Sequence, residues 1–379
     1  MKNILHLMTK LPDKYNSKYV EFANHALPDY NHTFICLVSG SGLDESLNQL
    51  NSVNIINLNN RGKLVKWIDV CKLLTSKQYD LNIFHGLFYT GPFLIFLAAI
   101  FRVFSIGEKT LWMTWGGDIY YFQNRAKTFS GWLNEQFRKS IIKRFSFISS
   151  PIKGEVDLVK LTYKSNAIEF STLYPNPLPY LDITAEHSVI VQDEKVHLMI
   201  GNSADPQNNH LAILEQISHL RGSVKVTCVL SYANVDSCYT EAVIKQGEAL
   251  FSDDFYPIRD FMAPDDYSQL LSGVDIAIYY HNRQQAMGNI YQFLYLGKSV
   301  FVRSDTLSNQ HLKLLGFRVC DSEKLSQVSI AELQALKQDS YERKIENQGI
   351  INEYCSDRVA KKLWDEALLY IFALLKKSD

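Results

Sequence analysis

The sequence has almost no net charge and no long hydrophobic segment. Lys and Arg number 39 and Asp and Glu 40, so the formal charge is −1 and no overall field attracts nucleic acid. Charged residues make up 21% and hydrophobic residues 46%, which excludes a disordered chain, a coiled coil and a collagen-like fibre. The longest apolar run, 92–100, has about half the length that a bilayer span requires. We therefore expect no transmembrane helix and no nucleic-acid partner.

The sequence also lacks paired cysteines and a leader-like start. None of its six cysteines has CxxC spacing, and no His/Cys cluster resembles a zinc site. Most of them lie in apolar runs and indicate buried thiols in a reducing cytoplasm. The first ten residues, MKNILHLMTK, have too short an apolar part for a signal peptide and predict a first strand.

Several catalytic motifs are missing. No GxGxxG follows a predicted strand, and neither GxxxxGK[ST] nor GxSxG occurs, so the sequence supports no dinucleotide fold, P-loop or hydrolase elbow. The acidic pairs Asp253-Asp254 and Asp265-Asp266 are adjacent rather than spaced as DxD. We expect no cofactor, no metal ligands and, if the protein handles nucleotide sugars, a metal-independent site.

What the chain does contain is an alternation of short apolar runs and helix-length segments, which predicts parallel sheets covered by helices. The segment Tyr174-Pro-Asn-Pro-Leu-Pro179 holds three of the ten prolines and interrupts the pattern. The alternation and this interruption together predict an α/β protein with two domains, each built on a parallel sheet, and a ligand cleft between them. The expected parts are an N-terminal domain (1–175), a linker (176–193), a C-terminal domain (194–355) and a last helix (356–379), for which packing back on the N-terminal domain is one option.

The expected elements follow from the same pattern. In the first half we predict strands at 3–8, 33–38, 53–58, 81–85 and 110–115, and helices at 15–27, 62–76, 89–104, 128–145 and 152–164. In the second half we predict strands at 195–201, 224–230, 275–280 and 299–303, and helices at 208–220, 234–249, 288–297 and 357–376. The last helix shows helical spacing of Leu363, Ala367, Tyr370 and Leu374.

In open parallel sheets ligands bind beyond the carboxyl ends of strands, so the residues there are the candidates. After the predicted strand 195–201, Gly201-Asn202-Ser203 precedes a helix and could hold a diphosphate, although an ordinary turn is the alternative. After 275–280, the segment 281–290 is rich in side-chain donors and contains Arg283; its alternative is a solvated loop.

In the first half, Asp118 follows Gly116-Gly117 at a strand end, where a general base would lie; the alternative is a helix cap. His85 ends the preceding strand and should lie next to Asp118 if the two strands are neighbours. It is a second candidate for the base, with a structural histidine as the alternative.

Four motifs in this order resemble glycosyltransferase family 56: Phe84-His85-Gly86, Trp115 to Tyr120, Gly201-Asn202-Ser203 and Arg283-Gln284-Gln285-x-x-Gly288. Known members transfer 4-acetamido-4,6-dideoxy-D-galactose from a TDP donor to an undecaprenyl-diphosphate-linked disaccharide of enterobacterial common antigen. The resemblance implies a GT-B fold of two Rossmann-like domains, whose parallel sheets face each other across the cleft, with the donor on the C-terminal domain and the acceptor on the N-terminal domain. Gly117, where the family pattern has Ala, and Ala286-Met287 depart from that pattern and leave the sugar and the acceptor open.

The resemblance and the strand-end argument together give a set of expected site residues. The donor should contact Gly201, Asn202, Ser203, Arg283, Gln284, Gln285, Gly288, Asn289 and Gln292, with Tyr232 and Phe261 near the base. The acceptor should contact Thr9, Lys10, Gly117 and Tyr120, and Asp118 and His85 should be catalytic.

The charge is distributed unevenly. Residues 1–180 hold 20 Lys and Arg against 13 Asp and Glu, a net of +7, whereas residues 181–379 have a net of −8. The basic residues Arg138, Lys139, Lys143, Arg144 and Lys153 lie among the apolar residues Trp132, Phe137, Ile141 and Phe145. This pattern favours an interfacial helix on an anionic inner membrane, with the segment 92–104 as a second contact, whereas a core-facing helix with a basic outer face is the alternative.

The prediction is therefore a cytoplasmic, peripheral glycosyltransferase that joins a sugar from a nucleotide-diphosphate donor to a lipid-linked or other glycan. Two other functions remain open on the sequence. One is a nucleotide-sugar epimerase of the same fold, which needs acid and base groups but no lipid affinity. The other is a non-catalytic sugar-binding protein.

Overall fold

The computed structural model describes residues 1–11, 14–39, 54–175, 195–231, 237–338 and 340–378. The chain divides into two compact units, one formed by residues 1–177 and 355–379 and the other by 178–354. The expected linker 176–193 and the candidate Tyr232 lie outside the described residues. No helix within the described ranges is both long enough and apolar enough to cross a membrane.

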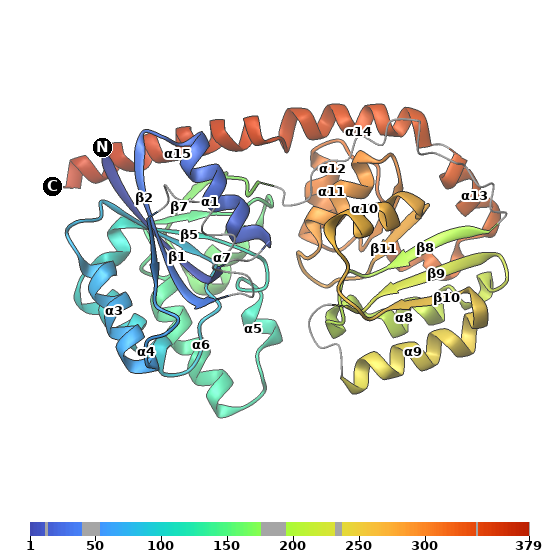
Figure 1. Ribbon diagram of the computed structural model, residues 1–379, viewed down its shortest axis with the longest axis horizontal. Coiled ribbons are helices and arrows are strands. Elements are labelled where there is room, and N and C mark those ends of the chain that lie inside the picture. The colour runs from blue at the N-terminus through green and yellow to red at the C-terminus, as the bar shows by residue number, and fades with distance from the viewer. Residues whose placement is uncertain (12–13, 40–53, 176–194, 232–236, 339, 379) are drawn as a thin grey trace. The chain divides into compact units, whose positions relative to one another are not determined.

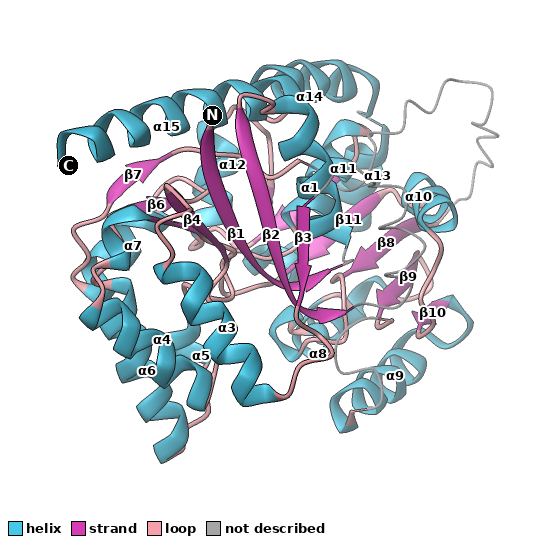
Figure 2. Cartoon of the chain, turned by 60° about the vertical axis from the view of Figure 1, so that its left-hand side comes forward, coloured by secondary structure: helices cyan, strands magenta, loops and turns pink. Residues whose placement is uncertain are grey.

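Unit 1 contains a parallel sheet of seven strands in the order β3-β2-β1-β4-β5-β6-β7 (Figures 1 and 2). Its strands are β1 (Lys2–Leu11), β2 (Tyr30–Ser39), β3 (Asn54–Asn57), β4 (Leu81–His85), β5 (Thr110–Met113), β6 (Phe147–Ser149) and β7 (Ile168–Phe170). Its helices are α1 (Lys14–Ala26), α3 (Lys63–Thr75), α4 (Pro92–Val103), α5 (Tyr121–Asn124), α6 (Phe129–Ile142), α7 (Glu155–Tyr163) and α15 (Asp357–Ser378).

Alternating side chains of these strands form two cores. Phe84 and Trp112 belong to the core under α3, α4, α6 and α7, whereas Ile83 and Met113 belong to the core under α1 and α15 (Figure 1). Strands that bury both faces are typical of parallel sheets. In α15 the side chain of Trp364 is fully buried and its indole N–H donates to the Leu173 carbonyl at 3.0 Å.

The sequence suggested a basic face on the segment 138–144; Lys143 and Arg144 are exposed, but Arg138 does not belong to such a face. Arg138 is 1% exposed; its guanidinium donates to the main-chain oxygens of Leu87 and Asp118 and pairs with Glu135. Ile141 and Phe145 are also buried in the core. The interfacial-helix prediction for this segment is therefore wrong in its central residue, because Arg138 faces the core and holds strand-end loops together.

Unit 2 contains a parallel sheet of six strands in the order β10-β9-β8-β11-β12-β13. Its strands are β8 (Val196–Ile200), β9 (Val224–Val229), β10 (Phe255–Ile258), β11 (Ile276–Tyr279), β12 (Ser299–Val302) and β13 (Cys320–Asp321). Its helices are α8 (His210–Gln216), α9 (Cys238–Phe251), α10 (Pro264–Gly273), α11 (Met287–Tyr295), α12 (Leu307–Leu314), α13 (Ile330–Gln338) and α14 (Ser340–Tyr354).

Both sheets reverse their strand order once, between β1 and β4 in unit 1 and between β8 and β11 in unit 2. At such a switch point the two loops at the carboxyl ends leave in opposite directions and create a crevice for ligands. The candidate residues at 85–86 and at 201–203 each follow a strand that borders a switch point. The fold thus selects one place in each unit where a site is expected.

Candidate functional site

At the unit 2 switch point, Gly201 ends β8 in a conformation that requires glycine. Its φ is +67°, and a Cβ atom there would lie 2.5 Å from His210 Nε2 and 2.8 Å from Asn208 Oδ1. The following residues do not run straight into a long helix; a short 3₁₀ turn at Pro206–Asn208 comes first, and α8 begins at His210.

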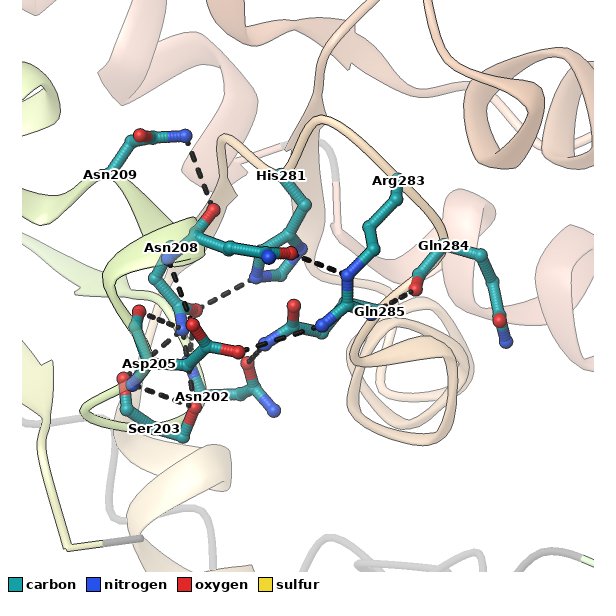
Figure 3. Close-up of polar contacts among 10 residues, drawn as sticks. Asn202, Ser203, Asp205, Asn208, Asn209, His281, Arg283, Gln284 and Gln285 are labelled. Atoms are coloured by element: carbon teal, nitrogen blue, oxygen red, sulfur yellow. Dashed lines mark hydrogen bonds and ion pairs between the residues drawn. The ribbon is translucent and has the colours of Figure 1, made fainter. Parts of the chain in front are cut away.

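The buried side chain of Asn208 organises this turn (Figure 3). Its Nδ2 donates to the Ser203 carbonyl at 3.1 Å and to the Asp205 carbonyl at 3.0 Å. Its Oδ1 accepts from the backbone N–H of Asn202 at 3.0 Å and from His281 Nε2 at 2.8 Å. Because Asn208 Oδ1 can only accept, the neutral His281 carries its proton on Nε2. Asn208 therefore joins the loop after β8 to the loop after β11.

His281 is 5% exposed and stays neutral near physiological pH. Burial, with smaller contributions from the Arg283 charge and from His210, lowers the pKa of His281 to about 3. A histidine in this state holds a loop in place rather than titrating.

Arg283 makes a second connection between the two loops (Figure 3). Its Nε donates to Gln207 Oε1, its Nη1 donates to the Gln284 carbonyl at 2.9 Å, and its Nη2 lies 3.5 Å from Asp205 Oδ2. The guanidinium predicted to hold a diphosphate is thus already engaged within the protein, and it adds positive charge beside the turn at 201–205.

Glutamine amides at this edge lack partners. Gln285 Nε2 donates to Asn202 Oδ1 at 3.3 Å, but Gln285 Oε1 and Gln284 Oε1 are buried and have no hydrogen-bond partner in the described part of the chain. Gln292, in the second turn of α11, is 1% exposed, and both atoms of its amide are unpartnered there. An unsatisfied buried amide costs about 1–3 kcal/mol, so groups of this kind mark places where a ligand completes the bonding.

The start of α11 lies beside these amides. Its N-cap residue Ala286 has a φ of +60° and provides no side-chain cap, and the first turn contains no acidic residue. Gly288 lies in this first turn, and Asn289 Nδ2 donates to the Tyr267 hydroxyl at 3.0 Å. Phe261, predicted near the base, is 80% exposed in the loop that follows β10.

At the unit 1 switch point, three buried histidines form a chain across the neighbouring strands β2, β1 and β4. His32 Nε2 lies 3.1 Å from the Leu27 carbonyl, and His32 Nδ1 lies 2.9 Å from His6 Nε2. His6 Nδ1 lies 3.0 Å from His85 Nε2, and His85 Nδ1 lies 3.2 Å from the Tyr174 hydroxyl. This series of histidines connects a residue at one strand end with the body of the sheet.

A single carbonyl fixes the proton positions along this chain. The Leu27 carbonyl accepts, so His32 carries its proton on Nε2 and His6 and His85, being neutral, do the same in turn. Burial lowers the pKa of all three histidines, that of His85 to about 3. His85 Nδ1 is then an acceptor, and the Tyr174 hydroxyl has one proton to share between it and Asn16 Oδ1, 3.0 Å away.

Aromatic side chains surround the Tyr174 end of this series of histidines. The half-buried ring of Tyr174 stacks on Tyr19 at 4.8 Å between centroids and meets Trp115 edge-on at 4.4 Å. Tyr15 also meets Trp115 edge-on, at 5.3 Å between ring centroids. His85 itself is 3% exposed, so Tyr174 is the more accessible member of the chain.

Asp118 does not have the geometry of a general base. It is 1% exposed, and its Oδ1 accepts from the backbone N–H of Trp115 and of Ile119, at 2.8 and 3.0 Å. Its Oδ2 accepts from the backbone N–H of Leu87 and from Trp112 Nε1, both at 2.9 Å. Burial raises the pKa of Asp118, and these N–H donors together with Arg138 oppose that rise. Both oxygens are occupied, so Asp118 fixes the loops after β4 and β5.

The expected partnership of Asp118 with His85 is also not present. The two strands are neighbours, as predicted, with His85 opposite Met113. Yet Asp118 bonds Trp112 on the face under α4 and α6, whereas His85 contacts Tyr19 and Tyr174 on the face under α1. Consecutive strand residues point to opposite faces, and this separates the two side chains.

The residues predicted for the acceptor lie around the same edge. Thr9 and Lys10 are in the last part of β1, Gly117 is half-buried after β5, and Tyr120 is 5% exposed and belongs to the core under α4. A buried Tyr120 supports the loop rather than presenting a surface to a ligand.

Sequence reasoning missed Asn208, His6, His32 and Tyr174. His6 is a polar residue within the apolar run 3–8, and this is the signal that could have identified it, whereas His32 lies between Asn31 and Thr33, just before the predicted strand 33–38, and has no such signal. Asn208 and Tyr174 carry no comparable signal, because a turn asparagine and a tyrosine beside prolines are common. No group of three His, Cys, Asp or Glu side chains within the described residues could hold a metal ion.

Several solved structures have a similar fold over nearly the whole length of this chain. HepE of Anabaena, solved with UDP and glucose, is similar over 98% of this chain and 100% of its own, with a TM-score of 0.70 and 14% identity. Sucrose-phosphate synthase of Thermosynechococcus elongatus is similar over 99% and 100%, with a TM-score of 0.70 and 11% identity. A putative UDP-N-acetylglucosamine 2-epimerase of Listeria monocytogenes is similar over 95% and 94%, with a TM-score of 0.54 and 14% identity.

These similarities, together with the two parallel sheets, give the chain the GT-B fold. A family model described as "4-alpha-L-fucosyltransferase glycosyl transferase group 56" matches residues 1–346. The chain therefore belongs to glycosyltransferase group 56.

Proposed function

We propose that the protein transfers a 6-deoxyhexose from a nucleoside-diphosphate donor, held by unit 2, to a hydroxyl of a lipid-linked oligosaccharide, held by unit 1. The observation that carries the proposal is a set of buried amide atoms without partners in the described residues at the unit 2 switch point: Gln284 Oε1, Gln285 Oε1 and both amide atoms of Gln292. Sugar and ribose hydroxyls both donate and accept hydrogen bonds, so they would satisfy these amides. Asn202, Ser203 and Asn289 complete the polar surface.

The diphosphate would bind at the start of α11. Uncapped backbone N–H groups at a helix N-terminus attract phosphate, and Gly288 leaves room for close approach. The Arg283 guanidinium adds positive charge nearby without being the main ligand. The leaving nucleoside diphosphate gains charge in the transition state, and fixed donors of this kind stabilise it without a metal.

The donor sugar is proposed from a feature that two sugars have in common. The matching family is described by fucosyl transfer, and the enterobacterial members that the motifs resemble transfer 4-acetamido-4,6-dideoxygalactose. Both sugars are 6-deoxygalactose frames with a methyl group at C5. We propose such a sugar, carried by TDP, as the donor.

The acceptor would be activated through the histidine chain. The acceptor hydroxyl gives its proton to the Tyr174 oxygen as Tyr174 gives its own to His85 Nδ1. His85 then passes its Nε2 proton to His6, and His6 passes its own to His32, which ends as imidazolium. A buried His85 whose pKa is about 3 is a weak base alone, and transfer along the chain moves the charge away from the acceptor.

The acceptor class and the location follow from the resemblance and the charge distribution. An undecaprenyl-diphosphate-linked glycan lies in the anionic inner leaflet, and residues 1–180 carry a net charge of +7. We propose a protein that works at the cytoplasmic face of the inner membrane in surface-polysaccharide synthesis, including enterobacterial-common-antigen or O-antigen pathways.

The test is calorimetric titration of the full chain with TDP-, UDP- and GDP-sugars, followed by a transfer assay with and without EDTA. The proposal expects the tightest binding for a TDP-linked 6-deoxy sugar and unchanged transfer in EDTA. Absence of binding to all three nucleotide classes would contradict the donor site. Restoration of activity by Mg²⁺ or Mn²⁺ after chelation would contradict the metal-free scheme.

A further inference from the structure

Apolar side chains are exposed at the N-terminal ends of three helices of unit 1. Leu64 is 55% exposed and Phe129 77%, where fully folded units normally bury such residues. We call the set the edge surface; its members are Leu64, Val65 and Ile68 at α3, Phe88, Ile95 and Phe96 at α4, and Phe129 and Trp132 at α6.

These residues lie at one edge of the unit. Helices α3, α4 and α6 pack in this order against one face of the sheet (Figure 1). Trp67 of α3 contacts Phe93 and Phe96 of α4 at 5.9 Å between centroids. The Gly91 N–H, before α4, donates to Asn134 of α6 at 3.0 Å. A helix that covers a parallel sheet begins near the carboxyl edge of the strands, so the edge surface borders the edge that carries Tyr174 and His85.

The charge around the edge surface is predominantly positive, although Asp69 directly follows Ile68. Segments 61–68, 86–103 and 125–134 contain no Asp or Glu, and their basic residues are Arg61, Lys63, Lys66, Arg102, Arg125 and Lys127. Helix N-termini ordinarily favour acidic residues because the helix dipole is positive there, yet the first turns of α3, α4 and α6 contain none. Three positive helix ends and exposed cations thus surround an apolar surface.

We propose that the edge surface docks on an anionic lipid bilayer. Apolar side chains enter the headgroup boundary while Arg61, Lys63 and Lys127 contact anionic headgroups, the combination that holds peripheral proteins on membranes. The inference rests on the proposed lipid-linked acceptor, and it places the membrane at α3, α4 and α6 starts instead of at the basic residues 138–144. Docking there would bring a membrane-borne acceptor to the carboxyl edge of the unit 1 sheet.

The experiment is co-sedimentation of the full chain with vesicles of phosphatidylcholine alone and with about 30% phosphatidylglycerol, without any sugar substrate. We expect binding to the anionic vesicles that falls as salt is raised, since the Debye length shortens to about 8 Å at physiological ionic strength. Arg61→Gln with Lys63→Gln should weaken it by more than tenfold, because each cation near an anionic surface contributes about fivefold.

Matched variants test whether vesicle binding depends on the edge surface or on exposed hydrophobic side chains in general. Leu64→Asn with Ile95→Asn should abolish sedimentation, whereas Leu161→Asn with Leu369→Asn, which are 81% and 66% exposed elsewhere in unit 1, should leave it unchanged. Lys362→Gln with Lys376→Gln serves as the control for charge. Melting curves check that each variant is folded, and brominated lipids should quench Trp132, a signal that Trp132→Phe removes.

Several results would overturn the proposal. Equal vesicle binding by the Leu64/Ile95 variant and the unchanged protein would do so, as would no binding at all to anionic vesicles. Loss of a dimer in sedimentation velocity, with vesicle binding unaltered, would identify the edge surface as a contact between copies of this chain. Nucleotide calorimetry on the same samples tells these failures apart from failure of the donor site.

Discussion

The Asp118 and histidine networks of unit 1 and the glutamine amides of unit 2 differ in how their buried polar groups are bonded. In unit 1, Asp118 has four N–H donors on its two oxygens, and the three histidines bond one another in series. In unit 2, loops are joined by Asn208 and Arg283, but the amides of Gln285 and Gln292 remain incompletely bonded among the described residues. A network that is complete without a ligand fixes geometry, whereas an incomplete one requires a ligand to complete it.

This difference assigns distinct tasks to residues of similar chemistry. A carboxylate and an amide at a strand end both look like site residues in the sequence. Both carboxylate oxygens of Asp118 accept hydrogen bonds from within unit 1, whereas the amide of Gln292 has no hydrogen-bond partner in the described part of the chain. Three substitutions test the comparison.

The largest effect is expected for Asp118→Asn, which retains the size of the side chain but replaces one acceptor oxygen by a donor. An amide nitrogen in the place of Oδ2 would face the N–H groups of Leu87 and Trp112. We expect a loss of about 2–4 kcal/mol in the free energy of unfolding. Calorimetry should show a melting temperature lower by roughly 5–15 °C.

Nucleotide binding by unit 2 is the internal control for this variant, and it should not change. A variant that melts like the unchanged protein but turns over a hundredfold more slowly would show that Asp118 is the base after all. The contrast between the two switch points would then fail.

An effect of intermediate size is expected for Gln292→Leu, and it should appear in donor binding rather than in stability. Removing an unpartnered buried amide should leave the melting temperature of the free protein the same or higher, because no hydrogen bond is lost. Donor affinity should fall by about 5–100-fold, as expected when one or two hydrogen bonds to a ligand are lost. Thermal melting without ligand and titration with the donor measure the two effects.

The exposed Gln310, changed to Leu, provides the matched control. If Gln292→Leu destabilises the free protein and leaves donor affinity intact, the amide has a structural role and unit 2 resembles unit 1.

The smallest effect concerns the histidine chain, tested by His32→Gln. A glutamine can donate to the Leu27 carbonyl and accept from His6 Nε2, so both hydrogen bonds are retained, but it cannot take a proton. We expect near-normal stability at pH 7.5 and a turnover reduced on the order of tenfold, with the donor KM unchanged.

Acid denaturation supplies a second measurement for His32→Gln. Burial lowers the pKa of His32 in the folded protein, so the unfolded chain binds the extra proton and stability falls as pH drops below about 6.5. Removing this histidine should make stability less dependent on pH below about 6.5, with urea midpoints as the measurement. An unaltered slope together with normal turnover would exclude proton transfer along the chain.

Much of the fold could be predicted from the sequence, because buried parallel strands are short continuous apolar runs between helix-length segments. The strand predicted at 81–85 has the same bounds in the structure, and the long last helix is present as α15. Strands β6, β7 and β13 escaped prediction because they have only two or three residues, and β10 because it contains Pro257, which an edge strand tolerates. The apolar face predicted for α15 was also wrong in part, because its member Tyr370 is 55% exposed, whereas Trp364, which the prediction did not include, is buried.

The sequence by itself determined the two α/β units, the strand-end positions of the candidate residues and the family resemblance, because periodicity and motif order are local properties. Only the tertiary structure decided which of those residues have their hydrogen bonds satisfied within the protein and which do not. Whether a carboxylate such as Asp118 meets four N–H groups, or an amide such as Gln292 meets none, depends on loops that are distant in the chain and adjacent in the sheet. Hydrogen bonding is short-ranged and directional, so bonding state follows from that adjacency and not from the residue type.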